Sequence, residues 1–375
     1  MKLKRFFCAL LIMTICVLFA SCDYSDNDKH LDFADEYREY GNMLVLGVVN
    51  DTDLTEDGVV YLDSITDNLN IQFANLTEYD SEYILKLFLD YEEIEYFIDD
   101  EIKNGYVFQA KSDESLIIPV KLNSSIDFNN SHILTVAVLT APNKHAKNSD
   151  LMSNSYGMVL SYELAPRDGT RSISTNKICS DPTKYLELNY QGLMLNLDFD
   201  AANNATTQFP PQNIFAKAGE TITLAYRAGN YENASELMVI VLIDWKQSQI
   251  NDVNSLYIRN KPGYIGYGEL NITTPLQAGE YEVTAFVVDS PFSLRDFNTF
   301  HTHDTAYRFT LTVQTSVYKG YKQDKIEMRG DRAEMSDFPL YLNTVAGGLD
   351  RRDQTIGGFS FVVKIYALPV VEIIG

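Results

Sequence analysis

The chain has 375 residues, of which 45% are hydrophobic, and its 52 acidic and 30 basic side chains give a formal net charge of −22 at pH 7. So acidic a surface repels phosphate backbones, which argues against a nucleic-acid partner. A chain of this length predicts two domains or more, and its hydrophobic fraction is large enough to fill their cores.

The first 21 residues have the order of a secretory signal peptide. A basic head at residues 2–5 precedes an apolar run at residues 6–19, and the small residues Ala20 and Ser21 follow. The apolar run is shorter than the roughly 20 residues that cross a bilayer core. We therefore expect a signal peptide over residues 1–21 rather than a transmembrane anchor.

The end of this segment, Leu18-Phe19-Ala20-Ser21-Cys22, resembles the lipobox of bacterial lipoproteins. The resemblance implies cleavage between Ser21 and Cys22 and attachment of lipid, with acyl chains such as palmitate, to the Cys22 thiol. Phe19 departs from the family pattern, which usually has leucine there. The alternative is that Cys22 is an ordinary cysteine of a plain signal peptide.

Such a lipid would be a membrane anchor, because each buried methylene contributes about 0.8 kcal/mol and several acyl chains together hold a protein firmly. Residues 22–35 then form an acidic tether with too few apolar residues to fold. The acidic stretch also resembles the surface-export signal of lipoproteins in the Bacteroides group. We expect an exported protein, lipid-anchored to the bacterial cell membrane or outer membrane and exposed at the surface of the cell envelope.

Removal of the signal peptide changes both the charge and the cysteine count. Three basic residues leave with it, so 27 basic and 52 acidic side chains remain and the net charge is 27 − 52, or −25. Cys8 and Cys16 leave as well, and Cys22 carries the lipid. Cys179 is left without a cysteine partner, so we expect no internal disulfide and a fold stabilised by its core.

Two stretches rich in β-formers, residues 83–91 and 237–245, both end in an aliphatic residue, an aspartate and an aromatic residue, at a spacing of 154. Four further matches follow in the same order at spacings of 148–151: residues 71–73 with 222–224, 122–123 with 270–271, 132–142 with 281–291, and 158–164 with 307–313. The series predicts an internal repeat. Two unrelated β domains with generic strand chemistry remain the alternative.

Each copy has about seven or eight strand patterns separated by turn residues, which predicts an all-β fold of two tandem antiparallel β-sandwiches. In the second copy, residues 275–289 resemble the Gly-x-Tyr entry into strand F of bacterial immunoglobulin-like and fibronectin-III-like domains. The resemblance implies that Tyr281 is a tyrosine-corner residue whose hydroxyl bonds to nearby backbone. Phe286 and Val288 indicate that both faces of this strand are partly covered.

These patterns divide the chain into six segments. We expect a signal peptide at 1–21, an acidic tether at 22–35, the first sandwich at 36–164, a linker at 165–182, the second sandwich at 183–315 and a C-terminal β extension at 316–375. In the last segment, residues 359–367 alternate as a strand does. It either folds onto its own chain or is donated to a neighbouring chain, which would give self-association through residues 357–375.

The search for chemistry finds no catalytic set, so we expect a protein that is not an enzyme and holds no cofactor or metal. The run Asp53-Leu-Thr-Glu-Asp-Gly58 begins like a calcium loop, but Ser64 stands where the bidentate glutamate is required. His301 and His303 have no third ligand near in sequence, and we interpret them as part of a polar loop.

Tyr91 and Trp245 end equivalent strands, where the loops of a sandwich form a rim. They are the candidate ligand-binding aromatics, although aromatic residues are also common in strand cores. The sequence thus favours a lipid-anchored cell-envelope protein acting as a non-catalytic binding or scaffolding module for a glycan or a protein. The alternative is a structural subunit of a fimbria-like surface assembly that uses its C-terminal strand.

Overall fold

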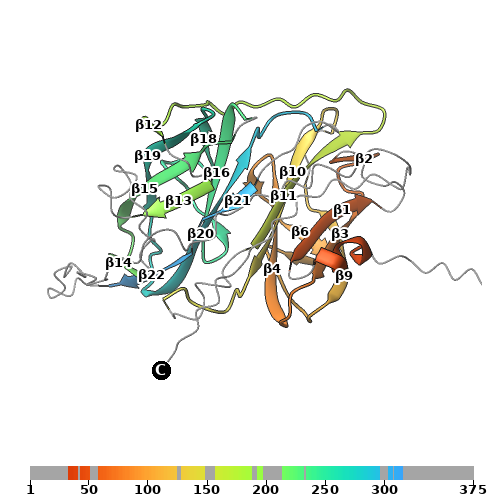
Figure 1. The fold of residues 1–375 in the computed structure, drawn as a ribbon, viewed down its shortest axis with the longest axis horizontal. Coiled ribbons are helices and arrows are strands. Elements are labelled where there is room, and N and C mark those ends of the chain that lie inside the picture. The colour runs from red at the N-terminus through yellow and green to blue at the C-terminus, as the bar shows by residue number, and fades with distance from the viewer. Residues whose placement is uncertain are drawn as a thin grey trace, which may run out of the picture. The chain divides into compact units, whose positions relative to one another are not determined.

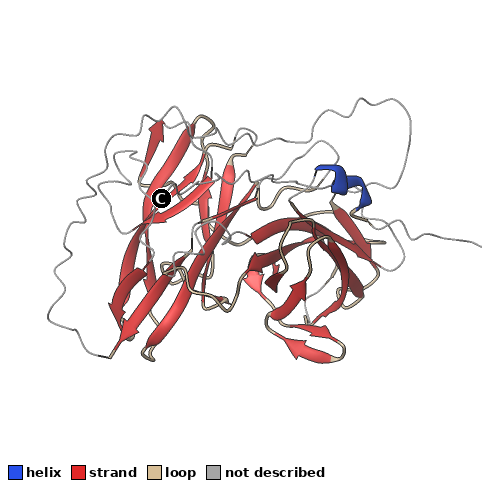
Figure 2. Cartoon of the chain, turned by 60° about the horizontal axis from the view of Figure 1, so that its bottom comes forward, coloured by secondary structure: helices blue, strands red, loops and turns tan. Residues whose placement is uncertain are grey.

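The computed structural model describes residues 33–40, 43–50, 58–124, 128–147, 157–187, 192–196, 213–231, 234–295, 303–306 and 308–315. The predicted signal peptide, Ser21, Cys22 and the segment 316–375 lie outside these residues. Residues 1–40 form a unit of their own, in which the described part contains the 3-10 helix η1 (Asp35–Tyr40). Every described strand belongs to the second unit, residues 41–375, and the fold is all-β, as predicted (Figure 2).

The first sandwich consists of two sheets (Figure 1). One sheet has the order β1-β3-β9-β6-β7, and the other has the order β2-β11-β10-β4-β5 with β8 also paired to β4. Its strands are β1 (Leu44–Asn50), β2 (Val59–Leu62), β3 (Asn68–Asn75), β4 (Ser81–Leu89), β5 (Glu92–Glu93), β6 (Tyr96–Ile98), β7 (Glu101–Lys103), β8 (Tyr106–Ala110), β9 (Glu114–Leu122), β10 (His132–Thr140) and β11 (Gly157–Pro166).

The second sandwich also has two sheets. One has the order β12-β19-β15-β13, and the other has the order β14-β22-β20-β16-β17, with β18 paired to β16 and β21 to β20. Its strands are β12 (Lys184–Glu187), β13 (Gly192–Asn196), β14 (Asn213–Lys217), β15 (Thr221–Gly229), β16 (Glu236–Ile243), β17 (Lys246–Gln247), β18 (Leu256–Arg259), β19 (Tyr264–Thr273), β20 (Gly279–Asp289), β21 (His303–Thr305) and β22 (Phe309–Gln314).

The strand orders of the two sandwiches correspond. The series β1-β3-β9 matches β13-β15-β19, β2-β11-β10-β4-β5 matches β14-β22-β20-β16-β17, and β8 on β4 matches β18 on β16. In both, an early strand (β2 or β14) pairs in parallel with the last strand (β11 or β22), whereas the other described strand pairs are antiparallel. In the first sandwich, β4, β10 and β11 correspond to strands C, F and G, and β1, β3 and β9 in the opposite sheet correspond to A, B and E, which is the immunoglobulin-like arrangement. The agreement supports the internal repeat, whereas the predicted domain boundaries stay a prediction.

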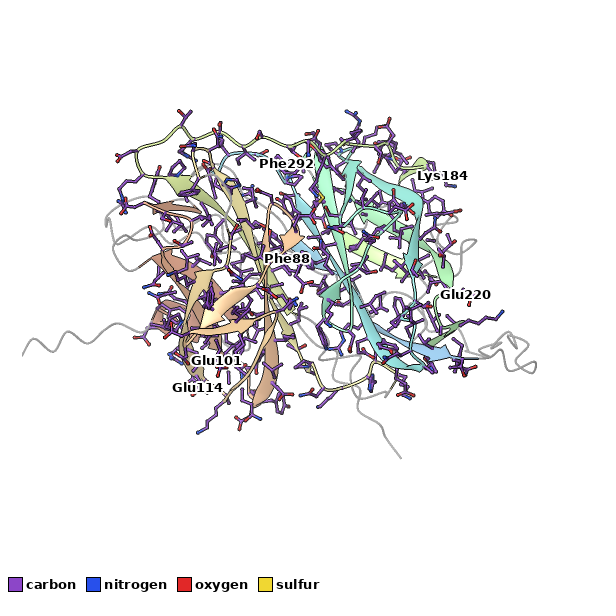
Figure 3. The ribbon with its side chains drawn as sticks, turned by 180° about the vertical axis from the view of Figure 1, so that it is seen from behind. Phe88, Glu101, Glu114, Lys184, Glu220 and Phe292 are labelled. Atoms are coloured by element: carbon purple, nitrogen blue, oxygen red, sulfur yellow. The ribbon has the colours of Figure 1, made fainter. Side chains whose placement is uncertain are left out.

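Three large clusters of buried apolar side chains account for most of the described core of this unit. One lies inside the first sandwich and one inside the second. The third lies between the sandwiches and joins β4, β10 and β11 to β16, β18 and β20. Phe88, labelled in Figure 3, belongs to this third cluster. Its ring meets that of Phe286 edge to face, with centroids 5.3 Å apart.

The third cluster explains why the central strands are apolar on both faces. On β20, Val283, Ala285 and Val287 point into the second sandwich, whereas Phe286 and Val288 point toward the first. The predicted covering of both faces of this strand is confirmed.

The predicted tyrosine corner is also confirmed. The Tyr281 hydroxyl donates to the main-chain oxygen of Gln277 at 3.0 Å, just before β20 begins. Gly279 lies against the Tyr281 side chain, because a Cβ there would be 3.3 Å from ring atom Cε2 and from the hydroxyl oxygen of Tyr281. This contact fixes the entry into β20 and so the placement of the strand that faces the first sandwich.

Candidate functional site: the interface between the two sandwiches

The two predicted rim aromatics lie in the interface between the sandwiches. Tyr91 is fully buried, and its hydroxyl donates to the main-chain oxygen of Pro291. Trp245 is half-buried, and its Nε1 donates to the main-chain oxygen of Pro142 at 3.0 Å. Each sandwich thus donates one aromatic hydrogen bond to the matching proline of the other, and in this structure the Tyr91 ring has no face open to a ligand.

The turns that carry these aromatics have the same backbone. Asp90 and Tyr91 have φ of 50° and 69°, and Asp244 and Trp245 have φ of 50° and 65°. Two successive left-handed residues make a tight hairpin turn between β4 and β5 and between β16 and β17. The two turns occupy matching positions of the predicted internal repeat, and their equal backbone conformations agree with it.

A second reciprocal contact joins the short strands after these turns. The Glu93 main-chain N–H donates to Gln247 Oε1 at 2.6 Å, and the Gln247 main-chain N–H donates to Glu93 Oε2 at 2.7 Å. The Gln247 side-chain amide also donates to the main-chain oxygen of Tyr91 at 2.8 Å. The interface is therefore hydrogen-bonded along its polar border as well as packed at its apolar centre.

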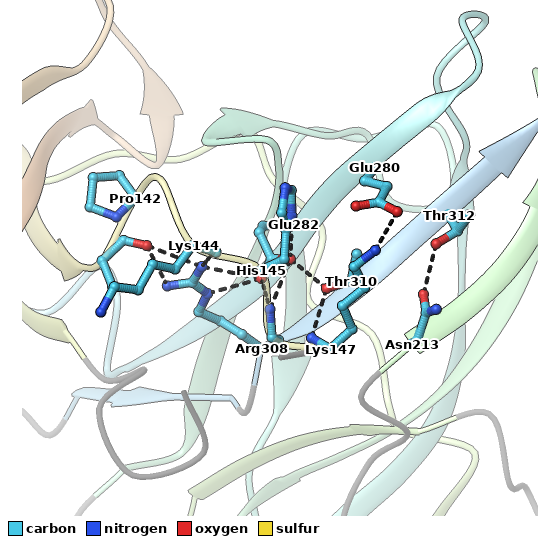
Figure 4. A network of polar contacts seen from close by, with 12 residues as sticks. Pro142, Lys144, His145, Lys147, Asn213, Glu280, Glu282, Arg308, Thr310 and Thr312 are labelled. Atoms are coloured by element: carbon cyan, nitrogen blue, oxygen red, sulfur yellow. Dashed lines mark hydrogen bonds and ion pairs between the residues drawn. The ribbon is translucent and has the colours of Figure 1, made fainter. Parts of the chain in front are cut away.

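A buried carboxylate of the second sandwich, Glu282 on β20, binds the segment that follows β10 (Figure 4). It accepts from the main-chain N–H of Ala146 at 3.1 Å, from Arg308 Nη2 at 3.1 Å and from the Thr310 hydroxyl at 2.6 Å. His145 Nδ1 lies 3.1 Å from its Oε1. We call these residues the Glu282 cluster.

Arg308 is the cation of this cluster. It donates to the main-chain oxygens of Thr140 and Lys144, both at 2.7 Å, and its guanidinium lies 4.7 Å from the centroid of the Trp245 ring. Burial lowers the pKa of Arg308, and the neighbouring Glu282 carboxylate opposes that shift. The pair is thus a structural ion pair inside the interface.

The first sandwich has a similar carboxylate, Glu163 on β11. It accepts from the main-chain N–H of Arg295 at 2.9 Å, from Arg171 at 2.8 and 3.0 Å, and from the Ser131 hydroxyl at 2.6 Å. Burial alone would raise the pKa of Glu163, but these hydrogen bonds together hold it below its ordinary value. We call these residues the Glu163 cluster.

The two clusters show that the segments after β10 and β20 cross to the opposite sandwich. Ala146 follows Pro142 and binds Glu282, whereas Arg295 follows Pro291 and binds Glu163. The pairs Pro142–Pro291 and Ala146–Arg295 have the same spacing of 149 residues. The exchange is therefore reciprocal, and each sandwich supplies main-chain donors for the buried charge of the other.

Sequence reasoning missed both carboxylates. The signal was present, because Glu163 and Glu282 interrupt strands that are otherwise buried, and charged residues are rarely buried without a partner. Their cation partners Arg171 and Arg308 are 8 and 26 residues away, but the main-chain donors from the opposite sandwich lie 132 and 136 residues away, too far to be recognised from local spacing.

The weaker motifs give no site in the described part of the chain. His303 is buried, and its Nε2 lies 2.9 Å from the Ser161 hydroxyl oxygen. His301 and residues 53–57 lie outside the described residues. Within the described residues, three or more His, Cys, Asp or Glu side chains nowhere gather as a metal site would require. None of the described helices is long and apolar enough to span a membrane.

Comparison with known proteins gives only remote likenesses. No protein family model matches, and neither does any curated protein. A C. elegans MSP family member is 15% identical, with a TM-score of 0.19 over 28% of this chain and 94% of that one. A PapD-like domain of human CEP192 is 12% identical, with a TM-score of 0.20 over 38% and 96%. CBD12 from CALX1.2 is 6% identical, with a TM-score of 0.21 over 65% of this chain and 82% of that one. Similarity this low carries no functional argument.

Proposed function

We propose that the protein is a lipid-anchored component of the bacterial cell envelope that acts as a non-catalytic binding or scaffolding module. The reciprocal interface is the observation that supports the non-catalytic binding or scaffolding role. Its aromatic and charged groups, among them Tyr91, Trp245, Glu163 and Glu282, contact the opposite sandwich rather than converging on an open cleft. Two sandwiches joined this way present fixed outer sheets and edges, which suits recognition of a glycan or a protein or the spacing of other envelope components.

The anchor rests on the Leu18–Cys22 sequence and is tested by Cys22→Ser. The variant should lose acyl labelling and move from the membrane to the soluble fraction, because the lipid is the anchor. Cys179→Ser is the matched control and should keep both properties. Undiminished detergent partitioning of Cys22→Ser would refute the lipobox interpretation. Arrays of glycans and envelope proteins, probed with the soluble variant, then test the binding role.

The structural-subunit alternative depends on residues 357–375, which lie outside the described part of the chain. The alternation at residues 359–367 favours a strand, and burying each large apolar side chain yields about 1.5–3 kcal/mol. If this strand folds onto its own chain, deleting 357–375 should lower the melting temperature at every protein concentration. If it is donated, the truncated protein should be monomeric and should bind a synthetic 357–375 peptide. A truncated protein that is monomeric, fully stable and indifferent to the peptide would contradict both.

A further inference from the structure

Lys86 is a buried lysine at the edge of the interface. It lies on β4 between Ile84 and Phe88, whose side chains belong to the cluster between the sandwiches, and it shares their face because alternate residues of a strand do. Its side chain is 1% exposed. A lysine buried to this extent requires polar partners at its nitrogen.

Two side chains meet at the Lys86 nitrogen. The nitrogen donates to Oδ1 and to the main-chain oxygen of Asn104, both at 2.9 Å, and it forms an ion pair with Oε1 of Glu93. The amine thus lies in contact with both a carboxamide and a carboxylate. This is a nucleophile, an electrophile and a group that can transfer a proton between them.

The surroundings hold these groups in place. Oε2 of Glu93 accepts the main-chain N–H of Gln247, so the second sandwich fixes the carboxylate. Asn104 is followed by Gly105 at a φ of +115°, and a Cβ at Gly105 would lie 3.4 Å from the Lys86 nitrogen and 3.3 Å from its Cδ. The glycine therefore allows the turn before β8 to close over the lysine.

We propose that Lys86 and Asn104 join in an intramolecular isopeptide bond, with Glu93 as the acid and base of the reaction. The Lys86 nitrogen, as a neutral amine, forms a bond to Cγ of Asn104, and the bond between Cγ and Nδ2 breaks. Glu93 accepts a proton from the attacking nitrogen and passes it to Nδ2, which leaves as ammonia. The reaction needs no oxidant, cofactor or second substrate.

The environment favours each step. Burial lowers the pKa of the Lys86 amine, which favours its neutral form, although the Glu93 carboxylate acts in the opposite direction. Asn104 is exposed, so ammonia can leave into solvent and its loss is irreversible in practice. The product links β4 to the turn between β7 and β8 across 18 residues of sequence. In a mature chain that we expect to lack disulfides, this bond is an internal covalent cross-link, a property beyond the proposed binding role.

The test is the intact mass of the purified full-length mature chain. Once the mass of the lipid on Cys22 is subtracted from every sample, the wild-type protein should be lighter than its sequence by one ammonia, and digestion should yield a branched peptide that joins Lys86 to Asn104. Asn104→Ala and Lys86→Arg should both have the mass of their sequences. Asn123→Ala is the matched control, because Asn123 bonds to a different glutamate, Glu95, and this variant should keep the cross-link.

Two results would overturn the proposal. A wild-type mass equal to that of the sequence, without the branched peptide, excludes the bond. Loss of ammonia that persists in Lys86→Arg indicates instead a cyclic imide at Asn104-Gly105, which forms without any lysine. Circular dichroism shows whether each variant is folded. Asn104→Ala removes only an exposed side chain, so this variant should fold even if Lys86→Arg does not, and its mass then still tests the bond.

Discussion

Among single residues, the buried carboxylates contribute most to the connection between the sandwiches. The side chains of Glu282 and Arg308 are 2% and 1% exposed, and each is the charge partner of the other. A buried ion pair contributes little relative to an apolar pair, but removing one member leaves the other charge buried and uncompensated. The clusters therefore specify how the sandwiches fit more than they add to stability.

Glu282→Gln should accordingly lower the free energy of unfolding by about 3–5 kcal/mol, because Arg308 keeps its charge without its carboxylate. Urea denaturation at neutral pH measures the loss. The control is Glu280→Gln on the same strand, whose ion pair with Lys147 involves side chains 39% and 30% exposed. That change should cost about 0–1 kcal/mol. Equal losses in the two variants would contradict a structural role for the buried pair.

At the scale of elements, the two hairpin turns set the direction in which Tyr91 and Trp245 enter the interface. Both turns use left-handed residues, and aspartate adopts that conformation more readily than β-branched residues do. Asp244→Val should therefore destabilise the protein by about 1–2 kcal/mol, seen as a lower melting temperature. Asp244→Gly removes the same exposed carboxylate without backbone strain and should be close to neutral. Equal losses of stability in Asp244→Val and Asp244→Gly would show that the aspartate side chain, rather than the left-handed backbone, stabilises the turn.

The sequence predicts the strands better than it predicts what covers them. Alternation placed Phe286 and Val288 on a second face of β20, and the Gly-x-Tyr pattern placed the Tyr281 hydroxyl, since both features depend on neighbours in sequence. The environments of Tyr91 and Trp245 depend on residues about 100 to 200 positions away, with sequence separations of 200 and 103. A loop rim and a buried interface both favour aromatic residues at strand ends, so local composition does not distinguish them.

For the whole molecule, the reciprocal interface predicts that the two sandwiches unfold together. Trp245 is the sole tryptophan of the chain and lies at this interface, so its fluorescence reports the contact between the sandwiches, whereas far-ultraviolet circular dichroism reports their strands. The two signals should change at the same urea concentration, as one cooperative transition requires. A fluorescence change at a lower urea concentration would show that the sandwiches separate first and that the interface is weaker than its contacts imply.

The exchange of segments also bears on the order in which the chain completes its fold. The first sandwich is synthesised with Ile84, Phe88 and Val159 still uncovered, and with Glu163 lacking the Arg295 main-chain donor, because β16, β20 and Arg295 all come later in the chain. The second sandwich emerges beside a partner that is already synthesised. Until the second half is synthesised, the first half is therefore an incomplete apolar surface, and this interval is the one in which the chain is most exposed to aggregation.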